Sequence, residues 1–213
     1  GYKMNPKEIK NELQTILSGK SKASRNSIIQ TITDQLRTSR RASPLAEEKH
    51  QNKAEETKFL INFASKNKLF IHNIKESDFI SEGAEQKVFI KDENNVIKLN
   101  DAIYYASWED YFFNLLIHNY FFPDTAYYLI GFHQNVKTLY AVVKQRFIKA
   151  NQITKLSEVK SFLATNGFHN TRNHDYYHPQ LGIILEDLHD ENVLTQNKIL
   201  YFIDTVFYLR PEV

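Results

Sequence analysis

The sequence has 213 residues, of which 42% are apolar, 13% are aromatic and none is cysteine. The length allows one ordinary domain or a small domain with an appendage, and the composition excludes wholesale disorder, disulfides, thiolate metal sites and a cysteine nucleophile. The 27 basic against 25 acidic residues give a net charge of +2, too small to indicate a polyanionic partner for the whole molecule. Because no apolar run is long enough to span a bilayer and no signal-peptide pattern opens the chain, we expect a soluble, cytoplasmic protein without a membrane partner.

The first 67 residues are predicted to form three helices. Asn5 and Pro6 open the first helix, which Gly19 ends, and the second carries apolar residues at helical spacing between Ile28 and Leu36. The third opens at Ser43-Pro44 and continues to Phe63. Their apolar stripes are narrow, so we expect residues 1–67 to be an α-helical arm that packs on the rest of the protein.

The arm contains a basic segment from Ser18 to Ser43. Its only acidic residue is Asp34, and its basic residues are Lys20, Lys22, Arg25, Arg37, Arg40 and Arg41. Three interpretations are open: a solvated linker, which is the simplest, a contact with a nucleic-acid backbone, or a basic site around Ser43 that a kinase modifies. It is the only hint of a nucleic-acid partner.

From Lys68 the sequence changes to β-branched and aromatic runs separated by turn residues. The predicted elements in chain order are strands at 79–81, 88–91 and 96–99 with a turn at 92–95, a helix over 105–122, and strands at 127–133 and 138–147 joined across 134–135. This order gives a five-stranded sheet with one helix in residues 68–148.

The remaining residues, 149–213, are predicted to hold a helix near 156–164 ended by Gly167, a polar loop over 169–180, and two short apolar runs at 183–185 and 200–203. The loop contains His169, His174, Asp175 and His178. A metal site is one interpretation of these side chains. A solvated loop is the simpler one, because turn-forming residues are frequent there.

The chemistry is carried by the stretch from Leu185 to Asp204. Asp187 precedes Asn192 by five residues, and Asn192 precedes Asp204 by twelve. This is the spacing of the catalytic loop and metal-binding aspartate of protein-kinase-like phosphotransferases. Such chemistry needs an aspartate to orient the attacking hydroxyl, with an asparagine and a second aspartate to hold Mg²⁺ against phosphate oxygens. The alternative is a polar turn between two core strands whose spacing is coincidental.

The upstream half of such a site is also present. Gly83 lies between the first two predicted strands, where a glycine lets backbone amides approach a polyphosphate. Lys98 lies on the third strand, in the place of a phosphate-contacting lysine. Glu109 in the following helix is the best candidate to pair with Lys98, with Asp110 as the alternative. A hinge that meets adenine is expected at 145–148.

With these motifs the sequence resembles the kinase-like domains found in polyvalent proteins of phages and mobile elements, relatives of the protein-kinase and aminoglycoside-phosphotransferase superfamily. The resemblance covers roughly residues 79–209 and rests on the segments 82–88, 96–98, 118–123, 131–132, 145–148 and 187–194. It implies an α+β, minimal bilobal protein-kinase-like fold, with an N-lobe at 68–148 and a reduced helical C-lobe with the catalytic loop at 149–213.

The resemblance further implies an ATP- and Mg²⁺-dependent phosphotransferase, with Asp187 as catalytic base, Asn192 and Asp204 as metal ligands and Lys98 on the phosphates. The implied nucleotide-binding residues are Gly83, Ala84, Glu85, Gln86, Val88, Lys98, Glu109, Gln145 and Phe147. The acceptor is expected to be a protein hydroxyl.

The sequence departs from the protein-kinase pattern at three points. Leu185 and Glu186 replace the His and Arg of H-R-D, Thr205-Val206 replaces Phe-Gly, and nine residues follow Asp204. We therefore expect no arginine-mediated activation clamp and a reduced C-lobe, which the amino-terminal helices help to support. A pseudokinase that binds nucleotide without turnover, a small-molecule kinase and a nucleic-acid-binding protein remain alternatives.

Overall fold

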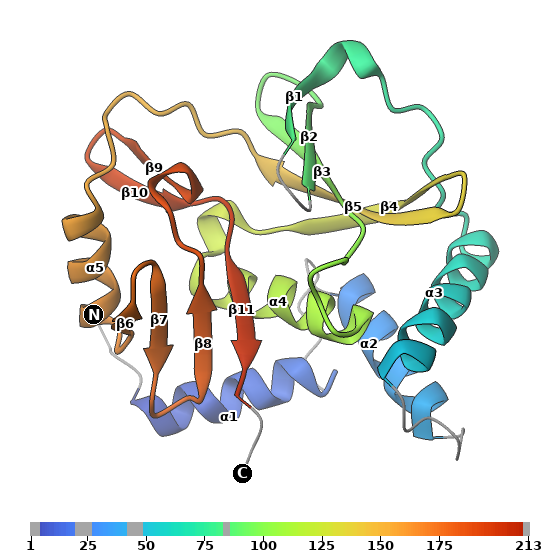
Figure 1. Cartoon of the computed structure of the whole chain (residues 1–213), viewed down its shortest axis with the longest axis horizontal. Coiled ribbons are helices and arrows are strands. Elements are labelled where there is room, and N and C mark those ends of the chain that lie inside the picture. Colours follow the sequence, from blue (N-terminus) through green and yellow to red (C-terminus); the bar gives the residue numbers. More distant parts are fainter. Residues whose placement is uncertain (1–4, 20–26, 42–48, 83–85, 211–213) are drawn as a thin grey trace. The chain divides into compact units, whose positions relative to one another are not determined.

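A computed structural model describes residues 5–19, 27–41, 49–82 and 86–210 (Figure 1). The fold is α+β, as predicted, and its sheets are antiparallel. The chain divides into two compact units: the first comprises residues 1–20, 113–126 and 148–213, and the second comprises 21–112 and 127–147. None of the described helices is both long and apolar enough to cross a membrane.

The second unit is built on a five-stranded antiparallel sheet with the order β1-β2-β3-β5-β4. Its strands are β1 (Phe79–Glu82), β2 (Gln86–Ile90), β3 (Asn95–Asn100), β4 (Tyr128–Asn135) and β5 (Thr138–Arg146). All five predicted strands are confirmed. Asp92 forms the predicted turn between β2 and β3, because its Oδ1 accepts the Asn94 amide at 2.8 Å.

The turn between β4 and β5 differs from the prediction by two residues. Asn135 still pairs with Thr138, so the chain turns at Val136 and Lys137 rather than at Gln134 and Asn135. Val136 has φ +55°, a conformation that β-branched residues disfavour. Turn propensity therefore pointed to the neighbouring asparagine.

The helices of the second unit are α2 (Ser27–Arg41), α3 (Lys49–Lys66) and the first part of α4 (Trp108–Phe121). With α1 (Pro6–Leu17), α2 and α3 confirm the three predicted amino-terminal helices. The predicted Ser43-Pro44 start lies outside the described residues. Helix α4 begins at Trp108, three residues after the predicted start at residue 105. The reason is that side chains of α3 bind its first turn and the loop before it.

Two charged side chains of α3 make these contacts. The Glu56 carboxylate accepts the amides of Trp108 at 3.0 Å and Glu109 at 3.1 Å, two of the donors that a helix amino terminus leaves unpaired. Lys53 Nζ donates to the carbonyls of Ala102 at 2.6 Å and Tyr105 at 2.8 Å. Glu56 is buried. A carboxylate at a helix amino terminus is also favoured by the helix dipole.

The first unit contains α1, the end of α4, α5 (Leu156–Thr165) and two sheets. A four-stranded sheet has the order β11-β8-β7-β6, and β9 and β10 form a hairpin. Its strands are β6 (His169–Arg172), β7 (Asp175–His178), β8 (Ile183–Glu186), β9 (Val193–Gln196), β10 (Ile199–Phe202) and β11 (Val206–Leu209). The described part of 149–213 thus holds one α-helix and six strands. The prediction of a helical C-lobe is wrong in its secondary structure.

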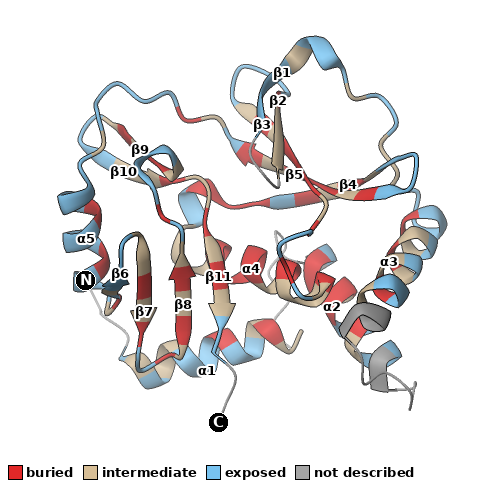
Figure 2. Ribbon diagram, in the orientation of Figure 1, coloured by how far each residue is buried: buried red, intermediate tan, exposed pale blue. Residues whose placement is uncertain are grey.

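The prediction of a solvated polar loop over 169–180 is also wrong, because β6 and β7 form a hairpin there. Arg172 pairs with Asp175 across a two-residue turn, and Asn173 supplies a left-handed conformation at φ +47°. Tyr176 and His178 on β7 are buried, and buried positions on this strand are coloured red in Figure 2. Polar residues on the opposite face concealed this period-two pattern.

Aromatic rings form much of the core of the first unit. Phe122, just after α4, stacks on Phe202 of β10 with 4.1 Å between ring centroids. Phe121 contacts both Phe168 and Phe207. These ring contacts fix the end of α4 against the strands of its own unit.

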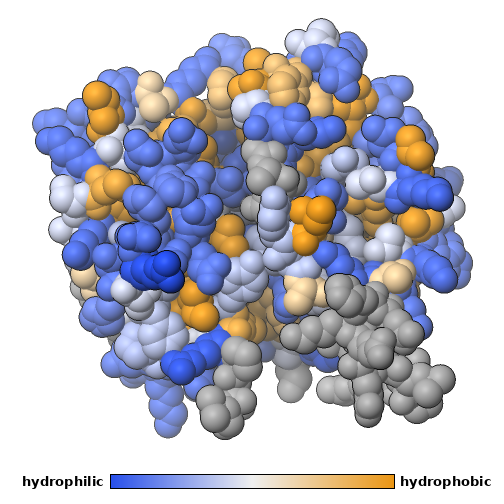
Figure 3. Space-filling model, viewed as in Figure 1, coloured by the Kyte–Doolittle hydropathy of each residue, from blue (hydrophilic) through white to orange (hydrophobic). Residues whose placement is uncertain are grey.

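Hydrophilic side chains cover much of the face seen in Figure 3, and apolar side chains lie in groups among them.

Glu56→Ala is expected to lower the free energy of unfolding by about 2–3 kcal/mol, because it removes a charged acceptor from two amides at the start of α4. Glu55→Ala makes the same change on the exposed side of α3 and is expected to cost little. Urea unfolding of both variants makes the comparison. Equal losses would contradict the role given to Glu56.

A second prediction concerns the buried His178, whose Nδ1 accepts the Leu181 amide at 3.2 Å. Burial lowers the pKa of His178, although a hydrogen bond to the Asn166 backbone opposes the shift. The stability that this neutral ring contributes is therefore complete above the unfolded pKa of about 6.5 and is lost as the pH falls toward the folded pKa, by at most about 1.4 kcal/mol per pH unit.

His178→Gln is expected to reduce the slope of stability against pH between about pH 7 and 5, measured by urea unfolding at each pH. His72 is exposed, so His72→Gln serves as the control and should keep the wild-type slope. An unchanged slope in His178→Gln would show that another group titrates.

Candidate functional site

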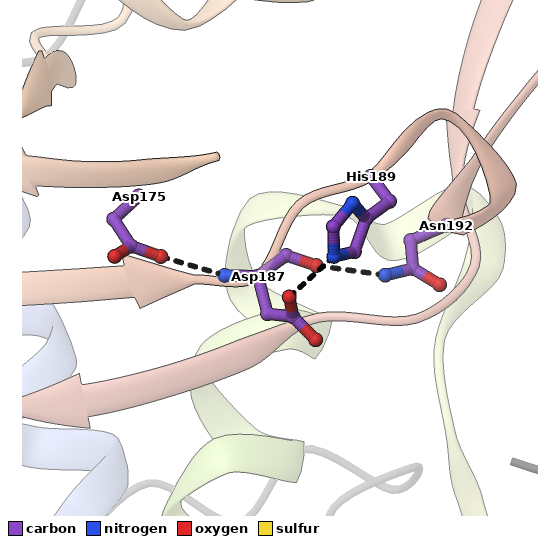
Figure 4. A network of polar contacts seen from close by, with 4 residues as sticks. All are labelled: Asp175, Asp187, His189 and Asn192. Carbon is purple, nitrogen blue, oxygen red and sulfur yellow. Dashed lines mark hydrogen bonds and ion pairs between the residues drawn. The ribbon is translucent and has the colours of Figure 1, made fainter. Parts of the chain in front are cut away.

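The first unit brings together the three residues predicted from the 187–204 spacing. Asp187 follows β8 with φ +58°, in the left-handed region that few non-glycine residues adopt. Its amide donates to Asp175 Oδ1 at 2.9 Å, and its carbonyl accepts from Asn192 Nδ2 at 2.8 Å (Figure 4). Asn192 closes a short 3-10 turn, η4 (Asp190–Asn192), immediately before β9. The loop between β8 and β9 is therefore bound at both ends.

Asp204 is joined to the same loop through the backbone. The carbonyl of Asn192 accepts the amides of Ile203 at 3.0 Å and Asp204 at 3.3 Å. The β9–β10 hairpin makes this approach possible, because Val193 pairs directly with Phe202. The β9–β10 hairpin thus brings the backbone of Asp204 to that of Asn192.

Residues of α4 hold the chain on the far side of Asp204. His118 is fully buried, and its Nδ1 lies 2.6 Å from Thr205 Oγ1 while its Nε2 lies 2.9 Å from the Thr125 carbonyl. Thr125 in turn donates to the Phe202 carbonyl. Phe202 and Thr205 are thereby anchored on either side of Asp204. The family resemblance includes the segment 118–123, but it assigned His118 no such role.

The electrostatics of the loop are dominated by carboxylates and two imidazoles. His189 Nε2 contacts Asp187 Oδ1 at 2.5 Å, and the side chains are 47% and 70% exposed respectively. His189 therefore contacts the candidate base as well as solvent. The His174 ring lies 4.3 Å from the His189 ring. Burial first, then repulsion from Asp175 and Asp187, raises the pKa of Glu186.

The histidines predicted as an alternative metal site are used differently. No set of three or more histidine, cysteine or acidic side chains among the described residues has the geometry to hold a metal ion. The buried His178 ring forms hydrogen bonds with the backbone of Leu181 and Asn166. Its ring also explains Gly167, where a Cβ would collide with the ring and φ is +87°.

The upstream predicted residues belong to the second unit. Lys98 lies on the central strand β3, paired with Val88 of β2 and Val143 of β5. It is 4% exposed, and its ammonium lies 5.5 Å from the centre of the Tyr127 ring. Glu109 lies in the first turn of α4, where Glu56 accepts its amide. The pairing of Lys98 with Glu109 stays a prediction.

The predicted nucleotide-binding residues around Lys98 follow the strands of the same sheet. Gln86 of β2 pairs with Asn100, and Gln145 of β5 is buried opposite Val96. The amide of Phe147 donates to the Asn94 carbonyl at 2.7 Å, which ties the predicted hinge to the β2–β3 turn. Gly83, Ala84 and Glu85 lie outside the described residues.

Comparison with known proteins identifies the family. A family model described as the serine/threonine/tyrosine kinase found in polyvalent proteins matches residues 53–211, and the chain belongs to that family. The resemblance seen in the sequence is confirmed. The match begins in α3 at Lys53, the residue that binds the loop before α4. No curated protein and no solved structure matches the chain significantly.

Sequence reasoning missed two acidic side chains that hold segments carrying candidate site residues. Asp175 was placed in a solvated loop, and only the pairing of β7 with β8 brings its carboxylate to the Asp187 amide. Glu56 was placed in an arm apart from the N-lobe, although it binds the start of α4. A lone acid on a polar helix face carries no signal of such a long-range partner.

Glu186→Gln tests the electrostatics of the loop. Because the pKa of Glu186 is raised in the folded state, its charge lowers stability once the pH rises through the folded pKa, and the effect is absent below the unfolded pKa of about 4.3. The variant is expected to be more stable than wild type at pH 7, by less than about 1 kcal/mol because Glu186 is only partly buried.

The gain should shrink toward zero as the pH is lowered to about 4, as followed by urea unfolding. Glu158 lies exposed in the first turn of α5, so Glu158→Gln provides a matched change without the neighbouring carboxylates. A loss of stability in Glu186→Gln at pH 7 would contradict the electrostatic analysis.

Proposed function

We propose that the chain transfers the γ-phosphoryl group of ATP to a hydroxyl, on a protein rather than on a small molecule, with Asp187 as the catalytic base. The observation that carries this proposal is the hydrogen-bonded set of Asp187, Asn192 and Asp204. Membership of a serine/threonine/tyrosine kinase family supports the reaction class and the type of acceptor.

The donor atoms around Asn192 and Asp204 fit Mg²⁺. Asn192 uses its Nδ2 to bind the Asp187 carbonyl, which turns Oδ1 away from that contact (Figure 4). Asp204 adds a carboxylate from the segment that follows β10. Mg²⁺ prefers oxygen ligands and commonly takes only one or two from the protein, with phosphate and water oxygens filling its shell. When bound, it would neutralise charge on the phosphate oxygens.

Asp187 is suited to receive the acceptor hydroxyl. Its carboxylate is largely exposed, with one oxygen in contact with His189 and the other turned away (Figure 4). A hydroxyl hydrogen-bonded to the second oxygen would be oriented for attack and would lose its proton to the carboxylate. Asp187 is held by backbone contacts at its own amide and carbonyl, so its position is set before an acceptor arrives.

Lys98 would contact the phosphates of the nucleotide. Its place on the middle strand of the sheet limits its backbone motion, and burial of its stem directs the ammonium toward the Tyr127 ring. The backbone around Gln145 and Phe147 would meet the adenine. These assignments rest on the family and on the strand register.

The proposal predicts ADP release from ATP in the presence of Mg²⁺. Asp187→Asn should lower turnover by roughly 10²–10⁴-fold, as expected for loss of a general base, while calorimetry still detects nucleotide binding. Asp204→Asn should weaken Mg²⁺-dependent nucleotide binding as well as turnover, because it removes a metal ligand. Phosphate on the protein, detected by mass spectrometry, would identify a protein acceptor.

Asp124→Asn is the control, since Asp124 is exposed in the short turn η3 (Pro123–Thr125). It should retain wild-type turnover. Nucleotide binding without turnover in the wild type would favour the pseudokinase alternative. Turnover that survives both Asp187→Asn and Asp204→Asn would contradict the proposed site.

A further inference from the structure

We propose that Asp175 is a positioning residue that holds Asp187 in its left-handed conformation from outside the catalytic loop. The inference rests on the proposed function, because its consequence for activity depends on Asp187 acting as base. Its structural part concerns only residues of the first unit. The contact itself is the hydrogen bond from the Asp187 amide to Asp175 Oδ1 at 2.9 Å (Figure 4).

The β6–β7 hairpin fixes Asp175 before it meets the loop. The carbonyl of Asp175 accepts from Asn170 Nδ2 at 3.0 Å and from Thr171 Oγ1 at 3.2 Å. Asn170 Nδ2 also lies 3.0 Å from the Asn173 carbonyl, across the turn. Two side chains of β6 therefore hold the residue whose carboxylate binds the loop. This network leaves the carboxylate of Asp175 available for the Asp187 amide.

The hairpin binds two successive amides of the catalytic loop. Besides the Asp187 amide, the Leu188 amide donates to the His174 carbonyl at 2.9 Å. Beyond this point β7 and β8 continue as an ordinary antiparallel pair, with Tyr176 opposite Leu185. The loop thus leaves the sheet at Asp187, and the turn of the neighbouring hairpin supplies the acceptors that a further strand residue would otherwise provide.

The conformation of Asp187 makes this support necessary. A positive φ is disfavoured for a residue with a side chain, and such residues persist only where surrounding contacts fix them. On the carbonyl side, Asn192 provides one contact. On the amide side, Asp175 provides the contact, and its charge strengthens the bond. Without the Asp175 contact, the Asp187 amide would lose this acceptor, and the Asp187 carboxylate could rotate away from the direction set by Asn192.

The kinetic test compares two substitutions of the same residue. Asp175→Ala removes the acceptor and is expected to lower kcat for phosphoryl transfer about tenfold, in line with the loss of one charge-assisted hydrogen bond, while KM for ATP stays within about twofold. Asp175→Asn keeps an oxygen acceptor and should recover most of kcat. Asp124→Asn is the control for loss of an acidic side chain in the same unit.

A second readout does not require activity. Hydrogen exchange of individual amides, measured by NMR on the full chain, should speed up about tenfold at Asp187 in Asp175→Ala and remain near wild type in Asp175→Asn. Amides of Leu185 and Tyr176, inside the β7–β8 pair, should keep their exchange rates. A residue that merely stabilises the sheet would raise exchange throughout the pair.

The outcomes separate the inference from the proposed function. Faster exchange confined to the loop, in a protein without turnover in any form, would support the positioning contact and reject the kinase proposal. Wild-type exchange at Asp187 in Asp175→Ala, or equal kcat losses in Asp175→Ala and Asp175→Asn, would overturn the positioning role whatever the reaction proves to be.

Discussion

The left-handed backbone of Asp187 is the constraint on which the candidate site depends. At φ +58° the chain leaves β8 and turns into the loop that ends at Asn192. The sheet provides the rigid side of this turn, because β8 lies between β7 and β11. Asn192 provides the other side, since its side chain binds Asp187 and its carbonyl binds the amide of Asp204. One set of hydrogen bonds therefore orders all three candidate catalytic groups.

The second unit shows the same principle at the start of α4. A helix amino terminus presents unpaired amides, and here Glu56 of α3 satisfies two of them, one belonging to Glu109. Lys53 holds the preceding loop by its carbonyls. Lys98 needs no such support, because both neighbours of β3 are strands. In each unit, a charged residue distant in sequence fixes the element that carries a proposed functional side chain.

The sequence was most informative where local chemistry decides the structure. β-Branched and aromatic runs, together with the turn at 92–95, predicted the five-stranded sheet. The spacing of Asp187, Asn192 and Asp204, supported by Gly83 and Lys98 upstream, selected the candidate site. It failed where the deciding contact is remote. The β6–β7 hairpin needs a left-handed backbone conformation at Asn173. The polar residues of its outer face give it the sequence pattern of a loop. The start of α4 and the role of Asp175 depend on partners about 52 and 12 residues away, which no local pattern reveals.

Whether Asp187, Asn192 and Asp204 form one nucleotide-dependent metal site can be measured most directly with Mn²⁺ and ATP. Mn²⁺ prefers the same oxygen ligands as Mg²⁺, and its unpaired electrons broaden the NMR signals of nearby amides. We predict that Mn²⁺ with ATP broadens the amide signals of residues 187–192 and 203–205 before others of the first unit, and that Asp204→Asn reduces the effect. Broadening centred elsewhere in that unit, or unchanged by Asp204→Asn, would contradict the proposed site.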